Sequence, residues 1–110
     1  LYRPISWLLL PPPWHRKRAL MIGDAAHAAS PNLSSGGGMG VEDAGVLAEL
    51  IGRGGEIDSV LEDFMARRWS RVSRVYRDSR TIHDKPREPG NWNAASPIVT
   101  SALTYLAALP

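Results

Sequence analysis

The sequence predicts an α/β fold in which one buried strand comes before a mostly helical second half. Three observations lead to this prediction: a short apolar run that ends in Gly-Asp at residues 19–24, a glycine-rich stretch after it, and two long segments with helical periodicity. A chain of 110 residues has room for one domain at most. Because one strand cannot satisfy its own backbone, we expect its parallel neighbours to lie outside this sequence.

The composition excludes several classes of protein. An apolar fraction of 44% is typical of a globular chain. The formal net charge of +2 is too small to indicate a nucleic-acid partner. The sequence contains no cysteine, which excludes disulfides and thiolate metal sites. Prolines interrupt the longest early apolar run, so we expect no membrane span and take the cytoplasm as the default location.

The first part of the chain contains two predicted strands. Residues 5–10, ISWLLL, suit a strand that three prolines stop, and residues 19–23, ALMIG, suit a buried strand that opens into a turn. The next segment, DAAHAA, is expected to form a short helical turn that ends at Pro31. Residues 32–38 have the composition of a loop.

Helical periodicity begins at Met39 and ends at the glycine-rich residues 52–55. The apolar face of this predicted helix contains Val41, Ala44, Leu47, Ala48 and Ile51.

A second helix is expected from about Asp58 to about Ile82, with Asp58 or Ser59 as its N-cap and Glu62 completing a capping box. Its apolar stripe consists of Leu61, Phe64, Met65, Val72, Val75 and Tyr76. A loop at residues 84–93 and a last apolar helix, PIVTSALTYLAAL, are expected to follow.

Arg68 lies near the centre of the second helix's apolar stripe. A guanidinium there costs stability unless it is paired, so one hypothesis pairs Arg68 with Asp43 or Glu42 of the preceding helix. The alternative is a buried stem with its charged head in water. Other arginines beside the stripe suit a solvated basic face, or a site for the phosphates of a nicotinamide cofactor: Arg67, Arg71 and Arg74.

The centre of the chain combines an acid with a bare backbone. The N–H groups of Gly37, Gly38 and Met39 have no side chains to shield them from solvent, and at a helix start such donors favour electron-rich groups. Asp24 follows the predicted strand at its carboxyl end, where α/β sheets usually bind ligands. Its carboxylate can accept hydrogen bonds from hydroxyls. Together these parts suit a ligand with hydroxyls and a flat, electron-accepting carbonyl group.

Each of these features also has a purely structural interpretation. A glycine-rich stretch is often a flexible connector, and Asp24 can cap the next turn. His27 and Asp24 offer two metal ligands but no third, so we predict no metal site and prefer a packed or hydrogen-bonded His27. A phosphate-binding loop is excluded, because no Gly-Lys-Ser/Thr follows the glycines.

Six elements occur in order along the chain: a strand, Gly-Asp-Ala-Ala-His at 23–27, Pro31, Gly36 and Gly38, Glu-Asp-Ala at 42–44, and an apolar helix. This arrangement resembles the second FAD-binding motif of the single-component flavoprotein aromatic hydroxylases, the family of para-hydroxybenzoate hydroxylase and the polyprenyl-methoxyphenol hydroxylases. The arginine-rich segment RRWSRVSRVYRDSR resembles the segment that comes after this motif in that family. The likeness covers about residues 14–83.

The resemblance implies a partial FAD-binding domain of the Rossmann-like, glutathione-reductase type, in a C-terminal fragment of such an enzyme. No G-x-G-x-x-G follows an N-terminal strand, so the N-terminal nucleotide-binding unit is expected to be missing. Ser35 stands where many family members have glutamine. The implied division is residues 1–17 as the end of a substrate-domain strand and linker, 18–52 as the FAD-binding strand, glycine-rich loop and helix, 53–83 as an arginine-rich helix, and 84–110 as a loop and apolar helix.

The resemblance also implies roles for single residues. Asp24 would hydrogen-bond the ribityl chain of FAD, and Pro31 would lie beside the isoalloxazine ring. The N–H groups of Gly37 and Gly38 would face the N1–C2=O edge of the flavin. The implied cofactor-binding set is Gly23, Asp24, Pro31, Gly36, Gly37, Gly38 and Met39. No residue is predicted to be catalytic.

The implied activity is that of an FAD-dependent monooxygenase. With NAD(P)H and O₂, such an enzyme would hydroxylate an aromatic or related ring compound through a flavin C4a-hydroperoxide, and the fragment alone would be inactive. Two alternatives stay open. One is a flavin-dependent halogenase or a geranylgeranyl-type reductase, which carry related Gly-Asp motifs. The other is a non-catalytic helical module whose arginine face binds a partner.

Overall fold

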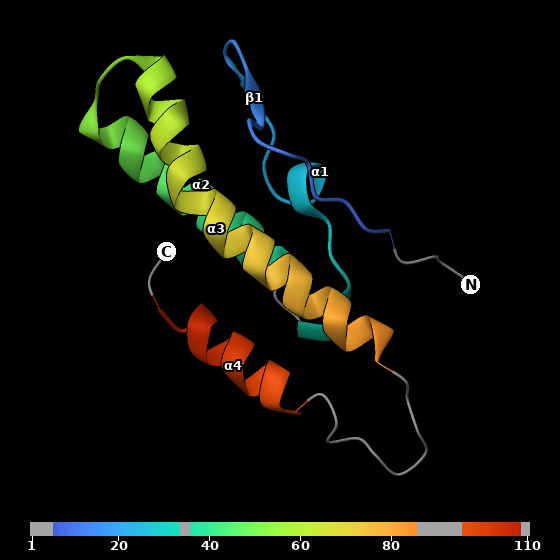
Figure 1. Cartoon of the computed structure of the whole chain (residues 1–110). Coiled ribbons are helices and arrows are strands. Elements are labelled where there is room, and N and C mark those ends of the chain that lie inside the picture. The colour runs from blue at the N-terminus through green and yellow to red at the C-terminus, as the bar shows by residue number, and fades with distance from the viewer. Residues whose placement is uncertain (1–5, 34–35, 86–95, 109–110) are drawn as a thin grey trace.

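Two long helices that run side by side in opposite directions form the scaffold of the chain (Figure 1). The computed structural model describes residues 6–33, 36–85 and 96–108. In order, its elements are β1 His15–Arg16, β2 Ala19–Leu20, α1 Asp24–His27, a 3₁₀ helix Pro31–Leu33, α2 Gly36–Arg53, α3 Ile57–Asp84 and α4 Ser96–Leu106. The predicted predominance of helix is confirmed.

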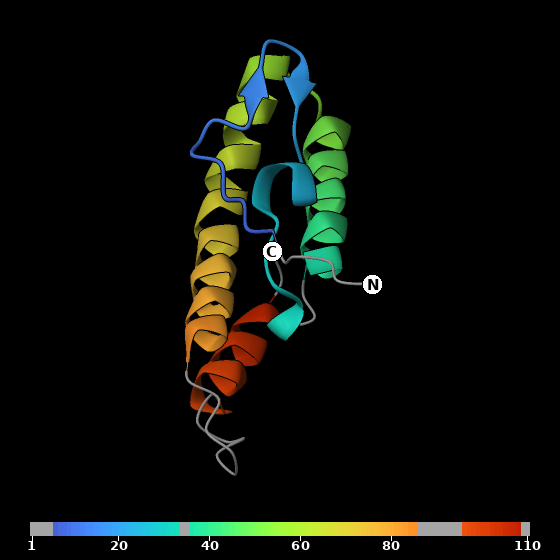
Figure 2. The ribbon, with the colours of Figure 1, turned by 90° about the vertical axis from the view of Figure 1, so that its right-hand side faces the viewer.

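The short elements lie on different sides of this α2–α3 pair. Figure 2 shows α1 in front of the gap between α2 and α3, with the small sheet beyond it toward the α2–α3 connection. The red helix α4 lies on the other side of the pair and packs on α3. Helix α1 is therefore held against both long helices, which matters for the residues at its start.

Helix α3 contributes the centre of the core. Five of the six residues of its predicted stripe are buried, Leu61, Phe64, Met65, Val72 and Val75, and the sixth, Tyr76, is half-buried. Trp14 packs beside Phe64 with ring centroids 6.5 Å apart, and its indole N–H donates to the carbonyl of Leu10 at 2.9 Å. Trp14 is thus a packing residue of the core.

The buried face of α2 is not the predicted one. The stripe expected to be buried is largely exposed, with Val41 73% and Ile51 55% accessible. The residues that α2 buries are instead Met39, Asp43, Val46 and Leu50. Helix α2 carries apolar residues on two faces. The buried face is the one that contains Asp43, which is hydrogen-bonded to Gly23, His27 and Arg68.

The strand predictions need correction. No strand is assigned to residues 6–10; the N–H groups of Leu8 and Leu10 donate instead to the carbonyls of Ala28 and Ala26, both at 2.9 Å. Of the predicted strand 19–23, only β2 is extended, and it pairs antiparallel with β1. The partner of β2 is thus β1, which a tight turn connects to it. Among the described residues, β2 has no parallel neighbour.

Both long helices begin earlier than predicted. Helix α2 starts at Gly36 rather than Met39, because the three glycines tolerate the helical conformation. Helix α3 starts at Ile57 with Glu56 at the N-cap and no side-chain cap, so the predicted capping box at Ser59 and Glu62 is wrong. The predicted C-cap of α2 is confirmed by Gly54, whose φ is 76°.

The C-terminal helix is confirmed as α4, whereas most of the predicted loop 84–93 lies outside the described residues. Within the described ranges, no helix is long and apolar enough to cross a membrane.

We expect Phe64→Ala to destabilise the protein by about 3–5 kcal/mol, because it removes a fully buried ring from the core. Urea unfolding measures the loss. The control Leu103→Ala removes a side chain that is 51% exposed and should change the free energy of unfolding by less than about 0.5 kcal/mol. Equal effects of the two substitutions would contradict the central place of Phe64 in the core.

Candidate functional site

Three glycines form the first turn of α2 and leave it bare. Gly37 and Gly38 are exposed, and a Cβ atom added at Gly36, Gly37 or Gly38 would meet nothing within 4 Å. The N–H groups of these residues have no carbonyl one turn earlier in the helix to bond. Met39, which we expected to provide a third free donor, is the first residue whose N–H can reach such a carbonyl. The helix therefore presents open donors at its start.

Asp24 and Pro31 are also on the surface. Asp24 is the first residue of α1 and is exposed, and within the described residues no hydrogen bond or ion pair involves its side chain. Pro31 is exposed at the start of the 3₁₀ helix. Met39 differs from both, because its side chain is buried in the core. Of the predicted set, Asp24, Pro31, Gly37 and Gly38 are thus exposed, Gly23 and Gly36 are half-buried, and the Met39 side chain packs in the core.

A close contact between two glycines brings the start of α1 to the first half of α2. A Cβ on Gly40 would lie 3.6 Å from the Cα of Gly23. Gly23 itself has φ 58° and ψ −143°, a conformation that only glycine adopts without strain. Asp24 directly follows Gly23, and Gly40 comes two residues after Gly38. The contact between Gly23 and Gly40 therefore places Asp24 in the same region of the molecule as the bare N–H groups of the glycine turn.

Asp43 is the buried group that holds this arrangement. Its Oδ2 accepts hydrogen bonds from the Gly23 N–H at 2.8 Å and from His27 Nε2 at 2.7 Å. Its Oδ1 accepts from Arg68 Nε at 2.7 Å. His27 is thus hydrogen-bonded and buried, as predicted. Since a carboxylate only accepts, Nε2 of His27 must carry the proton.

Arg68 is fully buried and paired, so the alternative with its charged head in water is excluded. Besides Asp43, it donates from Nη1 to Glu42 at 2.9 Å and from Nη2 to the carbonyl of Met39 at 3.3 Å. The predicted pairing with the preceding helix is confirmed for both acids. One guanidinium therefore ties α3 to two successive turns of α2.

Arg71 is not part of a solvated basic face. It donates from Nε and Nη2 to the two oxygens of Glu42, both at 2.7 Å, and from Nη1 and Nη2 to the carbonyls of Tyr105 and Leu106 at the end of α4. Arg74 stacks on the ring of Tyr105, 4.1 Å from its centroid. Arg71 and Arg74, two of the three arginines that we considered for phosphate binding, are therefore engaged in contacts within the protein.

The neighbouring charges lower the pKa of both acids. Burial alone would raise the pKa of Asp43, but the hydrogen bonds from His27, Gly23 and Arg68 outweigh it and lower that pKa. Burial likewise opposes ionisation of Glu42, whose pKa is lowered by Arg71 and Arg68. Glu42 in turn raises the pKa of Arg71. Two acids and two arginines therefore face one another inside the molecule as charged groups.

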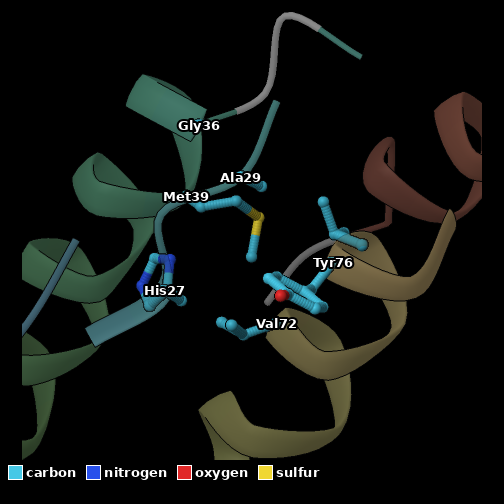
Figure 3. Close-up of a pocket in the computed structure, with 7 residues that line it drawn as sticks. His27, Ala29, Gly36, Met39, Val72 and Tyr76 are labelled. Atoms are coloured by element: carbon cyan, nitrogen blue, oxygen red, sulfur yellow. The ribbon is translucent and has the colours of Figure 1, made fainter. Parts of the chain in front are cut away.

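The described part of the chain encloses little space of its own near this cluster. Figure 3 shows a pocket between α1, α2 and α3, into which the Met39 side chain points between His27 and Tyr76. Its volume of about 10 Å³ is at the lower limit of what a single water molecule needs. Residues 6–33, 36–85 and 96–108 contain no group of three or more potential metal ligands.

The bonds from Gly23 and His27 to Asp43 were not predicted from the sequence. A signal was present: Asp43 has the 3- and 4-residue spacing of Met39, Val46 and Leu50, so a carboxylate lies on an apolar helix face. The same kind of spacing singled out Arg68. Considered on α2 as well, it would have predicted the buried face of that helix.

The chain is similar in sequence to proteins named as FAD-dependent monooxygenases. It is 36% identical over 78 residues to FAD-dependent monooxygenase nvfK of Aspergillus novofumigatus, covering 61% of this chain and 17% of that protein. It is 34% identical over 82 residues to the putative FAD-dependent monooxygenase YetM of Bacillus subtilis, covering 74% and 22%. With FAD-dependent monooxygenase paxM of Penicillium paxilli it shares 30% over 80 residues, covering 63% and 17%.

The chain spans about a fifth of the length of these relatives, 17% to 22%. No family model matches it, and no solved structure matches it.

We expect the protein to lose stability in acid through Asp43 and Glu42. Their folded pKa values lie below the ordinary values of 3.8 and 4.5, so their contribution is complete above those values and is lost as the pH falls through the folded pKa values. Urea unfolding between pH 7 and pH 3 measures this. Asp43→Asn should weaken the acid dependence, and the exposed control Asp63→Asn should keep it; identical curves would contradict the prediction.

Arg68→Met should destabilise the protein by about 3–5 kcal/mol, because it leaves the fully buried carboxylate of Asp43 without its guanidinium partner. The double variant with Asp43→Asn should lose less than the sum of the two single losses. The exposed pair of Arg53 with Glu49 provides the control, and Arg53→Met should have little effect. Additive losses for Arg68 and Asp43 would show that the pair is not coupled.

Proposed function

We propose, from the premise that this chain is related to a segment of FAD-dependent monooxygenases, that the protein containing it is an FAD-dependent monooxygenase. Residues 18–52 would form part of its FAD site. The observation that carries the proposal is the open glycine turn at the head of α2, with the exposed carboxylate of Asp24 nearby, which has no side-chain partner among the described residues.

The glycine turn has the chemistry for one end of a flavin. The start of an α-helix carries roughly half a positive charge, and its free N–H groups favour anions and electron-rich oxygens. Gly37 and Gly38 add no side chain that would keep a flat carbonyl edge at a distance. Donors held in this way by a helix stabilise negative charge without reorganising, which suits a flavin whose carbonyl edge becomes more negative on reduction.

Asp24 has the chemistry for the sugar-alcohol chain of FAD. An ionised carboxylate has only acceptor sites, so it suits hydroxyl donors. Its exposed side chain, which follows the Gly23–Gly40 contact directly in the chain, supports this role. Bound FAD would supply the redox chemistry between NAD(P)H and O₂. The residues of this chain would bind and orient it, and we assign none of them a catalytic role.

The finer parts of the proposal rest on the motif. We propose an aromatic or related ring compound as substrate and NAD(P)H as reductant, because the Gly-Asp-Ala-Ala-His motif and the Glu-Asp-Ala helix suit the aromatic hydroxylases. In this assignment residues 1–17 belong to a substrate domain and linker, 18–52 to the FAD-binding part, and 53–83 and 84–110 to the helices that support it. Turnover of NAD(P)H coupled to hydroxylation would separate this activity from halide-dependent or reductase chemistry.

The variant Gly37→Leu tests the glycine turn. We expect the complete protein to bind FAD and Gly37→Leu to bind it at least about 10-fold more weakly, because the new side chain would stand where the flavin edge lies. The apoprotein should keep or raise its melting temperature, since leucine favours a helix more than glycine and its Cβ meets nothing here. FAD titration and thermal unfolding give the two readouts.

Asp24→Ala should likewise weaken FAD binding, with the exposed Asp63→Ala as a matched control. Unchanged FAD affinity in both Gly37→Leu and Asp24→Ala would contradict the site, and a complete protein that takes up no FAD would contradict the function.

A further inference from the structure

Both backbone polar groups of Gly23, its N–H and its carbonyl, are hydrogen-bonded. Its N–H donates to the buried Oδ2 of Asp43, and its carbonyl accepts from the N–H groups of Ala26 and His27, both at 2.9 Å. Its Cα also lies against Gly40. No residue lies between Gly23 and Asp24, so these contacts determine where the main chain of Asp24 begins.

His27 reinforces the same anchor from the other end of α1. Its Nε2 proton goes to the Oδ2 atom that also holds Gly23, and its ring packs beside Trp14 with centroids 5.2 Å apart. One carboxylate oxygen therefore holds the first and last residues of the Gly23–His27 turn. This double attachment restricts both the position and the orientation of α1.

The other oxygen of Asp43 connects the anchor to the glycine turn. It accepts from Arg68, whose Nη2 donates to the carbonyl of Met39, the residue directly after Gly38. Arg68 also bonds Glu42, so it fixes the first two turns of α2 against α3. A continuous chain of hydrogen bonds thus runs from Gly23 through Asp43 and Arg68 to the end of the glycine turn.

We infer that Asp43, with His27 and Arg68, positions the two halves of the cofactor site by setting the place of Asp24 relative to the N–H groups of Gly37 and Gly38. This rests on the proposed function, because it takes the ligand to be FAD. Because Asp43 is fully buried, it would act on the ligand only through the groups that it holds, and we therefore class it as a positioning residue. Binding groups need to be held closely in place by such supporting contacts if they are to act together.

The same network contains a natural control for a purely structural role. Arg71 pairs with Glu42 and with the end of α4, and none of its contacts reaches Gly23, His27 or Asp43. Breaking that pair should weaken the fold without moving Asp24. Breaking the bonds of Asp43 should weaken the fold and also separate Asp24 from the glycine turn.

The experiment uses the complete protein, prepared as apoprotein, with FAD as the probe. Four variants are compared with the wild type: Asp43→Asn, His27→Leu, His27→Gln and Arg71→Met. FAD affinity is measured by titration at a temperature well below every melting point, together with the visible spectrum of the bound flavin and the melting temperature of the apoprotein.

We expect Asp43→Asn and His27→Leu to weaken FAD binding by about 10- to 100-fold and to change the flavin spectrum, as loss of a hydrogen bond to a charged group allows. His27→Gln keeps an N–H donor at a similar reach and should recover most of the affinity. Arg71→Met should lower the melting temperature but leave FAD affinity within about twofold, below the size of one lost hydrogen bond.

Four results would overturn the inference. If Asp43→Asn and His27→Leu bind FAD as the wild type does, positioning is wrong although the proposed function stands. If Arg71→Met loses as much affinity as they do, or if His27→Gln behaves like His27→Leu, the cluster acts only through stability. If the wild-type protein itself binds no FAD, the proposed function fails and this inference fails with it.

Discussion

The buried pair of Asp43 and Arg68 is the interaction on which the described structure depends. Taking two charges out of water is costly, and attraction between them repays that cost only when further hydrogen bonds satisfy the remaining atoms. Here Gly23 and His27 donate further hydrogen bonds to the carboxylate of Asp43. Glu42 and the carbonyl of Met39 accept further hydrogen bonds from the guanidinium of Arg68. The pair therefore joins α1, α2 and α3.

Glu42 and Arg71 extend the cluster to the end of α4. The interior thus holds two acids against two arginines, a balanced arrangement that leaves Asp24 outside it. Asp24 is exposed at the start of α1, with no partner in the part of the chain that the structure describes, and it lies close to the glycine turn that begins α2. The buried charges support the fold, and the exposed groups are available to a ligand, so the two tasks fall to different residues.

Prediction from the sequence succeeded where the spacing of residues within a single helix was enough to identify the buried face. The stripe on α3 and the need of Arg68 for a partner came from helical spacing, and the turn at α1 came from DAAHAA. Prediction failed on α2, where apolar residues lie on two sides. Val41 and Ile51 made one side look buried, yet that side is exposed. It failed also for the strands, because the backbone partners of residues 6–10 come from the end of α1.

The sequence by itself determined the candidate site residues and the motif they form, because Gly23, Asp24 and the glycines 36–38 carry their chemistry in residue type and order. Only the tertiary structure decided which face of α2 is buried and that Gly23 and His27 share one oxygen of Asp43. The physical reason is that a buried carboxylate selects its partners from segments far apart in the chain. Helical periodicity records spacing within a segment, and it carries no information about which donor lies across from it.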